Sequence, residues 1–175
     1  MAPNCLQIFT LILTCLTFIL LTTGLYSAMW IKKSVNGQTI SREGLYETCV
    51  LDGCSKIGPL TSVHRVSQIF GHLMIVIYVI NLAGQCAAVF LSYLRFTRIF
   101  ALIYFSTAII AFSLLVIYPT NIRPIGKDGQ QELWFDWGFY VFLSATLLLV
   151  GLSVQCYELD EDTFPGIELS RRDSS

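Results

Sequence analysis

The chain has 175 residues, of which 54% are hydrophobic and 13% are charged, and its formal net charge is −1. Soluble globular chains carry about 25% charged residues, so this composition excludes an ordinary soluble domain and favours a membrane protein. The balanced charge gives no reason to expect nucleic acid binding.

Four segments lack any Asp, Glu, Lys or Arg: residues 1–31, 66–94, 99–122 and 137–157. Each has roughly the 20 residues that a helix needs to cross a ~30 Å hydrocarbon core. We therefore predict one membrane domain over residues 1–157 and a cytoplasmic tail over residues 158–175. The predicted transmembrane helices are Leu6–Trp30, Val66–Leu94, Ile99–Tyr118 and Trp137–Tyr157.

The first span, Leu6–Trp30, has a second interpretation as a cleaved signal peptide. It lacks a basic N-terminal region, and its apolar stretch is longer than the roughly 7–15 residues of a signal peptide. We therefore predict that this span is retained.

The loop over residues 31–65 carries the clearest local signals. Asn36-Gly37 between alternating residues is typical of a β-hairpin, because its tight turn needs positive φ at both central positions. A second hairpin, turning through Val50–Gly53, would place Cys49 opposite Cys54 at a distance that a disulfide can bridge. Disulfides persist outside the cytosol, so we expect this loop to lie outside the cell.

The basic residues beside the spans give conflicting signals about orientation. Arg95 and Arg98 border a tight turn between the second and third spans, which favours the cytoplasm for that turn. Lys32 and Lys33 lie equally close to the first span and favour the opposite orientation. The cysteine pair decides between them, and we predict cytoplasmic termini with residues 31–65 and 119–136 outside.

The second span holds three polar side chains, which are His72, Asn81 and Gln85. The simpler interpretation is hydrogen bonding between helices, and the alternative is a haem or metal ligand, for which His72 has no evident mate. The absence of intramembrane Asp, Glu, Lys and Arg argues against a pump or coupled transporter. Without a catalytic or phosphate-binding motif, we predict neither an enzyme nor a cofactor.

The third loop and fourth span add further signals. A turn at Asp128-Gly129 predicts another strand in the loop. Small residues in the fourth span predict close packing inside the bundle or, alternatively, a homodimer face; they are Gly138, Ser144, Ala145 and Gly151. An aromatic group at the start of that span indicates an interfacial belt or a docking surface; its members are Trp134, Phe135, Trp137, Phe139 and Tyr140.

Two residues near the C-terminus are candidates for modification. Cys156 lies at the end of the fourth span, where either palmitoylation or a buried structural thiol is expected. Ser174 follows Arg171-Arg172, which could stabilise a phosphate, although a solvated tail is the simpler interpretation.

The first loop also carries a recognisable motif. Trp30, followed by Gly44-Leu45-Tyr46 and by Cys49 and Cys54, resembles the W … G-L-W-x-x-C … C pattern of the claudin, peripheral myelin protein and epithelial membrane protein superfamily. Arg65 matches a basic residue that claudins often carry at the start of the second span. Two later segments look like the claudin-like junction proteins related to transmembrane protein 47, namely Val116–Pro119 and Phe135–Gly138.

The resemblance implies a four-helix membrane bundle with a small extracellular antiparallel sheet, in which Leu45 and Tyr46 tuck against the helix ends. It implies a plasma-membrane protein that organises cell–cell junctions, adhesion or membrane domains through contacts with lipids, other junction or membrane proteins, or itself. Tyr46 in place of the second tryptophan, the short cysteine gap and the missing C-terminal PDZ ligand argue against a charge-selective pore. The alternative is an auxiliary subunit of an ion channel or receptor, a role of other branches.

Overall fold

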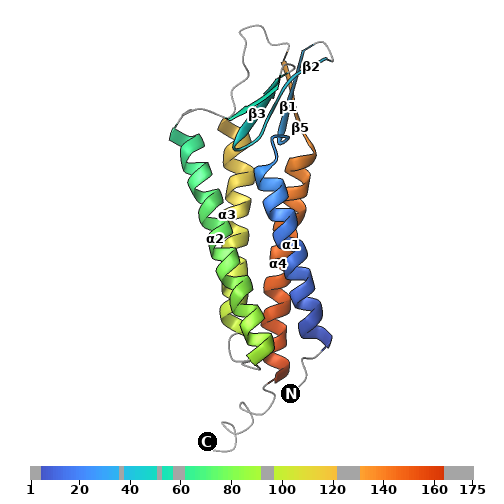
Figure 1. Ribbon diagram of the computed structural model, residues 1–175, viewed down its shortest axis with the longest axis vertical. Coiled ribbons are helices and arrows are strands. Elements are labelled where there is room, and N and C mark those ends of the chain that lie inside the picture. The colour runs from blue at the N-terminus through green and yellow to red at the C-terminus, as the bar shows by residue number, and fades with distance from the viewer. Residues whose placement is uncertain are drawn as a thin grey trace, which may run out of the picture.

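The computed structural model describes residues 5–35, 38–50, 53–56, 62–91, 97–121 and 131–163. Four long helices form an elongated bundle, and a small antiparallel sheet stands on one end of it (Figure 1). The helices are α1 (Cys5–Tyr26), α2 (Ser62–Leu91), α3 (Thr97–Asn121) and α4 (Trp137–Thr163). All four are long and apolar enough to cross a membrane, which confirms the predicted fold class.

The first helix ends earlier than predicted. Helix α1 stops at Tyr26, and Trp30 lies beyond it in the connection to the sheet. The backbone N–H of Trp30 donates to the carbonyl oxygen of Glu43, and its carbonyl accepts from the N–H of Asp136. Pairing with the sheet therefore takes the backbone groups that a longer helix would have used.

The other helices extend past at least one predicted end. Helix α2 begins at Ser62 rather than at Val66 and ends at Leu91, while the predicted end at Leu94 lies outside the described residues. Helix α3 continues through Pro119 to Asn121, with the hydroxyl of Thr120 donating to a carbonyl of the preceding turn. Helix α4 continues to Thr163, so the first residues of the predicted tail are helical. Hydrocarbon thickness limits the apolar part of a helix but not its polar extension into water.

The sheet has five strands in the order β4-β3-β2-β1-β5. Its strands are β1 (Ile31–Val35), β2 (Gln38–Glu43), β3 (Glu47–Val50), β4 (Gly53–Lys56) and β5 (Gln131–Phe135). Val35 pairs with Gln38 in an antiparallel register, which confirms the first hairpin, although Asn36-Gly37 lies outside the described residues. Strand β5 confirms the strand predicted in the third loop; Asp128-Gly129 is also outside the described residues.

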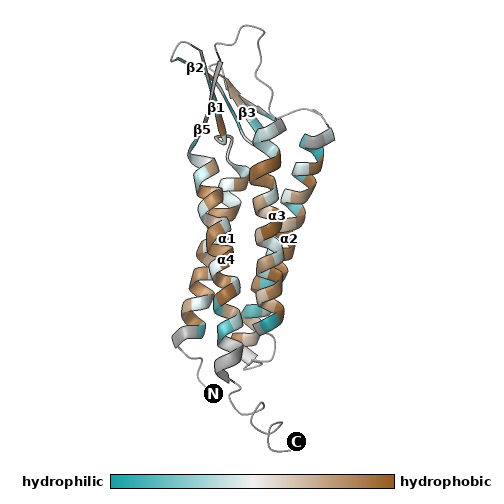
Figure 2. Ribbon diagram, turned by 180° about the vertical axis from the view of Figure 1, so that it is seen from behind, coloured by the Kyte–Doolittle hydropathy of each residue, from teal (hydrophilic) through white to brown (hydrophobic). Residues whose placement is uncertain are grey.

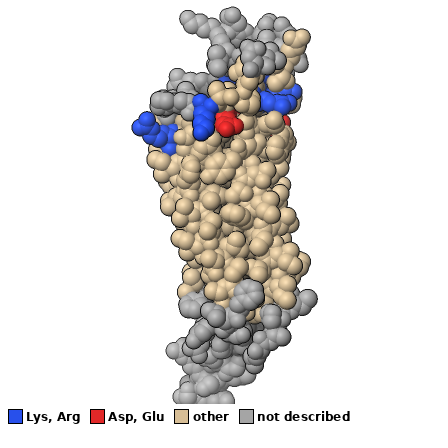
Figure 3. Space-filling model, viewed as in Figure 1, with Lys and Arg blue, Asp and Glu red and all other residues tan. Residues whose placement is uncertain are grey.

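The exterior of the bundle is apolar. Brown, hydrophobic residues dominate all four helices in Figure 2. In the face shown in Figure 3, a wide band without described charged residues lies below a level where Lys, Arg and acidic residues gather beside the sheet. Large apolar side chains point outward within this band, such as Leu102, which is 66% exposed. Such a surface is stable against lipid tails and identifies a membrane protein.

Candidate contact site on the sheet

Trp30 joins the sheet to the bundle. Its side chain is fully buried, and its indole Nε1 donates to the carbonyl oxygen of Gly24 over 2.6 Å. The ring packs edge-on against Tyr118 and tilted against Phe142, with centroids 5.4 and 5.0 Å away. Contacts of this kind from α1, α3 and α4 fix the point at which the sheet leaves the helices.

Gly44 and Leu45 hold the other side of the sheet. A Cβ atom on Gly44 would lie 2.0 Å from the carbonyl oxygen of Ser27, so only glycine fits at this position. Leu45 is fully buried, and its carbonyl accepts a 2.9 Å hydrogen bond from the side chain of Gln68. The hydroxyl of Tyr118 donates to the carbonyl of Gly44. The Gly-Leu segment is thereby fixed to α2 and α3.

Tyr46 lies at the ends of α1 and α2. Its ring stacks on Tyr26 with the centroids 4.9 Å apart, and its hydroxyl donates to the carbonyl oxygen of Gln68 over 3.1 Å. The Nδ1 atom of His72 lies 3.1 Å from the same hydroxyl. Burial, with a smaller contribution from Tyr26, raises the pKa of Tyr46, so this hydroxyl stays protonated as a donor. Leu45 and Tyr46 therefore occupy the helix-end position that the resemblance implied.

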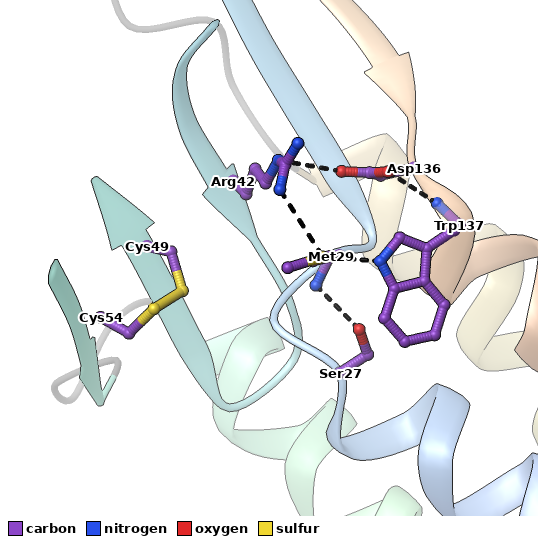
Figure 4. A network of polar contacts seen from close by, with 7 residues as sticks. All are labelled: Ser27, Met29, Arg42, Cys49, Cys54, Asp136 and Trp137. Carbon is purple, nitrogen blue, oxygen red and sulfur yellow. Dashed lines mark hydrogen bonds and ion pairs between the residues drawn. A yellow bond between two sulfur atoms is a disulfide. The ribbon is translucent and has the colours of Figure 1, made fainter. Parts of the chain in front are cut away.

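A polar seam closes the sheet against the start of α4 (Figure 4). The Nε atom of Arg42 lies 3.3 Å from Oδ2 of Asp136, which forms an ion pair without a hydrogen bond between these two atoms. The other carboxylate oxygen of Asp136 accepts from the N–H of Trp137 over 2.8 Å, where α4 begins. The sulfur of Met29 accepts from both Arg42 and the Trp137 indole. These contacts link β2, the 27–30 connection and α4.

The disulfide lies on the two strands beyond β2, where Cys49 pairs across the strands with the seam residue Arg42. Cys49 on β3 faces Cys54 on β4, and the two are bonded with their Cα atoms 4.0 Å apart, which confirms the predicted pair (Figure 4). Strand β4 begins at Gly53, whose φ of 144° favours glycine. The bond therefore joins the edge strand β4 to the rest of the sheet.

A bulge in β2 shapes the exposed side of the sheet. Ser34 pairs with Thr39 and Lys33 pairs with Ser41, which leaves Ile40 as the extra residue. Ile40 is 38% exposed and Val50 is 48% exposed. Both border an open hollow of about 270 Å³, which we call the bulge hollow. Its lining residues are Thr39, Ile40, Ser41, Arg42, Cys49 and Val50. Chemically it is a shallow contact surface with two apolar side chains and one guanidinium.

The polar residues of the second span divide into three cases. Gln85 hydrogen-bonds between helices, accepting from Thr14 over 3.0 Å and donating to Cys156, as the simpler interpretation predicts. His72 is exposed and contacts Tyr46 instead. Asn81 is buried, and neither its amide nitrogen nor its amide oxygen has a partner in the described structure. Within the described residues, no three His, Cys, Asp or Glu side chains form a group that could hold a metal ion.

The fourth span gives a mixed outcome. Gly138 and Ala145 are buried, which fits packing inside the bundle, whereas Ser144 and Gly151 face outward, where a homodimer face stays a prediction. Of the aromatic group, most side chains are about half exposed at the sheet end of α4. They are Trp134, Phe135, Trp137 and Tyr140. This exposure fits either an interfacial belt or a docking surface.

The remaining candidates are spread over the molecule. Arg65 is exposed in the first turn of α2. Cys156 is 2% exposed within the bundle, which favours the structural thiol over palmitoylation. Ser174 lies outside the described residues.

Sequence reasoning missed two ion pairs at the sheet. Lys33 is 3% exposed and lies 2.7 Å from Glu43, and Arg42 pairs with Asp136. Asp136 directly before a predicted helix is an N-cap signal that could have singled out one of them. Which basic residue pairs with Glu43 and which pairs with Asp136 depends on how the strands are arranged, and the sequence does not show it.

A scan against models of known protein families finds no match, and a search of curated proteins finds no significant one.

Proposed function

We propose that this protein is a claudin-like membrane organiser that acts at cell–cell contacts of the plasma membrane. In this proposal the sheet faces the outside of the cell, both termini are cytoplasmic, and the bulge hollow forms contacts with other membrane proteins or with a second copy. The motif of Trp30, Gly44-Leu45-Tyr46 and the cysteine pair supports the family, and the disulfide supports the orientation.

The observation that carries the proposal is the rigid attachment of the sheet. Trp30, Gly44 and Leu45 fix it to the helix ends through buried contacts, and the Arg42–Asp136 pair fixes it to α4. A surface held in this way loses little conformational entropy when it binds, which is what a repeated contact between proteins requires.

The exposed apolar residues of the sheet support a contact role. Ile40 and Val50 project beside Arg42, so the bulge hollow combines apolar area with a planar cation, a composition typical of the residues that dominate interfaces. The hollow is small and open, which fits a protein contact better than an enclosed small-molecule site.

The test is localisation of a tagged full-length protein in confluent cells. Ile40→Asp should lower its enrichment at cell borders by at least half without lowering its amount at the cell surface. Gln38→Asp adds the same charge on an exposed residue of β2 outside the hollow, and it should keep the enrichment. Equal behaviour of the two variants, or wild-type protein spread evenly over the cell surface, would reject the contact role.

An auxiliary subunit of a channel or receptor is the second candidate. The half-exposed side chains Trp134, Trp137 and Tyr140 favour it, because they offer a lateral aromatic surface next to the membrane. In that case the protein should co-purify with one channel or receptor, and Trp134→Ala together with Tyr140→Ala should abolish the association. Currents or signalling should then change without any cell contact.

A further inference from the structure

Met29 lies partly exposed in the connection between α1 and the sheet. Its backbone is fixed on both sides, because its N–H donates to the hydroxyl of Ser27 over 3.1 Å and its carbonyl oxygen accepts from the N–H of Gly138 over 2.9 Å. A Cβ atom on Gly138 would lie 2.7 Å from that carbonyl oxygen, so the connection lies directly against the start of α4. The side chain of Met29 therefore starts from a defined position beside the polar seam.

Two N–H donors point at the sulfur of Met29 (Figure 4). The Nη1 atom of Arg42 lies 3.8 Å from Sδ, and the indole Nε1 of Trp137 also donates to it. Neither nitrogen makes another hydrogen bond with a described residue. A thioether sulfur is only a weak acceptor, so a guanidinium and an indole share a poor partner here. The seam lacks a strong acceptor at this point.

The surroundings of the sulfur are open to solvent. Arg42 is 40% exposed and Trp137 is 47% exposed, so both side chains can move back to admit one more atom. Met74, in contrast, is fully buried inside the bundle. Oxidation of a methionine converts its thioether into a polar sulfoxide. At Met29 this reaction would supply the acceptor that the two donors lack.

We propose that Met29 is an oxidation site whose sulfoxide oxygen is bound by Arg42 and Trp137, with a peroxide as the oxidant. The sulfur lone pair attacks one oxygen of hydrogen peroxide, so that an S–O bond forms while the O–O bond breaks. The sulfur loses two electrons and the peroxide gains them. The transferred hydroxyl gives its proton to the departing hydroxide, which leaves as water.

Oxidation at this site tightens the seam. A sulfoxide disrupts an apolar core, but here its oxygen meets a guanidinium, and charge-assisted hydrogen bonds are the strong ones. Arg42 also lines the bulge hollow, so the modification fixes one side chain of that contact surface. The effect on contacts and the encounter with peroxide outside the cell rest on the proposed function, whereas the chemistry at Met29 does not.

The first experiment treats purified full-length protein in detergent with hydrogen peroxide and follows each methionine by peptide mass spectrometry. Met29 should gain oxygen at least about tenfold faster than Met74. Each of the two sulfoxide epimers is reduced by its own methionine sulfoxide reductase, so treating the isolated Met29 peptide with each enzyme measures their ratio. Donors fixed beside the sulfur should give at least about a threefold excess of one epimer. The double variant Arg42→Gln with Trp137→Phe should give nearly equal amounts.

Thermal unfolding provides the second measurement. Peroxide should raise the unfolding temperature of the wild type by about 2–4 °C relative to its effect on Met29→Leu. This control lacks the sulfur but keeps the same free cysteines, so their oxidation cancels in the comparison. The double variant should lose the increase. Both experiments use purified protein, so their outcome is independent of enrichment at cell borders.

Three results would each overturn the proposal. The first is oxidation of Met29 no faster than that of Met74. The second is an equal epimer ratio in the wild type, or an excess of one epimer that the double variant keeps. The third is an unfolding temperature that peroxide lowers in the wild type relative to Met29→Leu, because the sulfoxide would then loosen the seam.

Discussion

The indole Nε1 of Trp30 donates a 2.6 Å hydrogen bond to the carbonyl oxygen of Gly24 in the last turn of α1. Carbonyls in the last turn of a helix lack partners within the helix, so this bond satisfies one of them. The backbone of Trp30 meanwhile bonds to Glu43 and Asp136. Trp30 thus links the last turn of the first helix to the start of the sheet.

Trp30→Phe tests this bond. The smaller ring removes the donor and leaves the carbonyl of Gly24 with only the longer 3.3 Å contact from the N–H of Ser27. We expect a loss of about 1–3 kcal/mol in the free energy of unfolding, because a buried acceptor loses its donor and the core loses volume. Thermal unfolding in detergent measures the loss. Trp134→Phe, at a residue 60% exposed, is the control and should change stability little.

Gly44→Ala should be more damaging than its size suggests. The added methyl group would meet the backbone of Ser27 and Ala28, which cannot move without shifting the connection between α1 and the sheet. We expect little folded protein at the cell surface. Gly151→Ala has no atom within 4 Å of the new methyl group and should express like wild type. Normal surface expression of Gly44→Ala would contradict the close approach.

Removal of the disulfide should have a modest and non-additive effect. Cys49→Ser and Cys54→Ser each open a loop of a few residues, for which the chain-entropy relation gives about 2 kcal/mol. The double variant should be no less stable than either single variant, because the same bond is lost. An impermeant thiol reagent added to intact cells should label neither cysteine in the wild type and the remaining one in each single variant. Labelling of both in unreduced wild-type cells would disprove the bond.

The Arg42–Asp136 pair should contribute little to overall stability. Arg42 is 40% exposed, so solvent screens the pair, and a double-mutant cycle with Arg42→Gln and Asp136→Asn should give about 0.2–1 kcal/mol of coupling. The two single variants should also behave alike in the cell-border assay if the seam orients the sheet. A coupling near zero would show that this ion pair does not help to hold β2 beside the start of α4.

The helices and hairpins follow from local patterns, whereas the attachment of the sheet does not. Charge-free segments and Asn-Gly turns act within a few residues, so they predict the spans and the pairing of β1 with β2. The contact between Gly44 and Ser27 depends on how two distant segments meet. The amide of Asn81, unpaired among the described residues, depends on how α2 packs against its neighbours. Neither arrangement leaves a periodic or compositional trace in the sequence.

Asn81 and Gln85, one turn apart on α2, should respond differently to substitution by leucine. Gln85 bonds to Thr14 and Cys156, so Gln85→Leu should destabilise the bundle by roughly 0.6–1.7 kcal/mol. Asn81 is 1% exposed with both amide atoms unpaired among the described residues, so Asn81→Leu removes two buried groups that lack partners. Since leucine has the same branched arrangement of four side-chain heavy atoms and needs no hydrogen-bond partner, we expect unchanged or higher stability. Thermal unfolding of both variants in the same detergent makes the comparison. If Asn81→Leu destabilises as much as Gln85→Leu, the Asn81 amide has a hydrogen-bond partner, for example a buried water. The inference that this amide is unpaired would then be wrong.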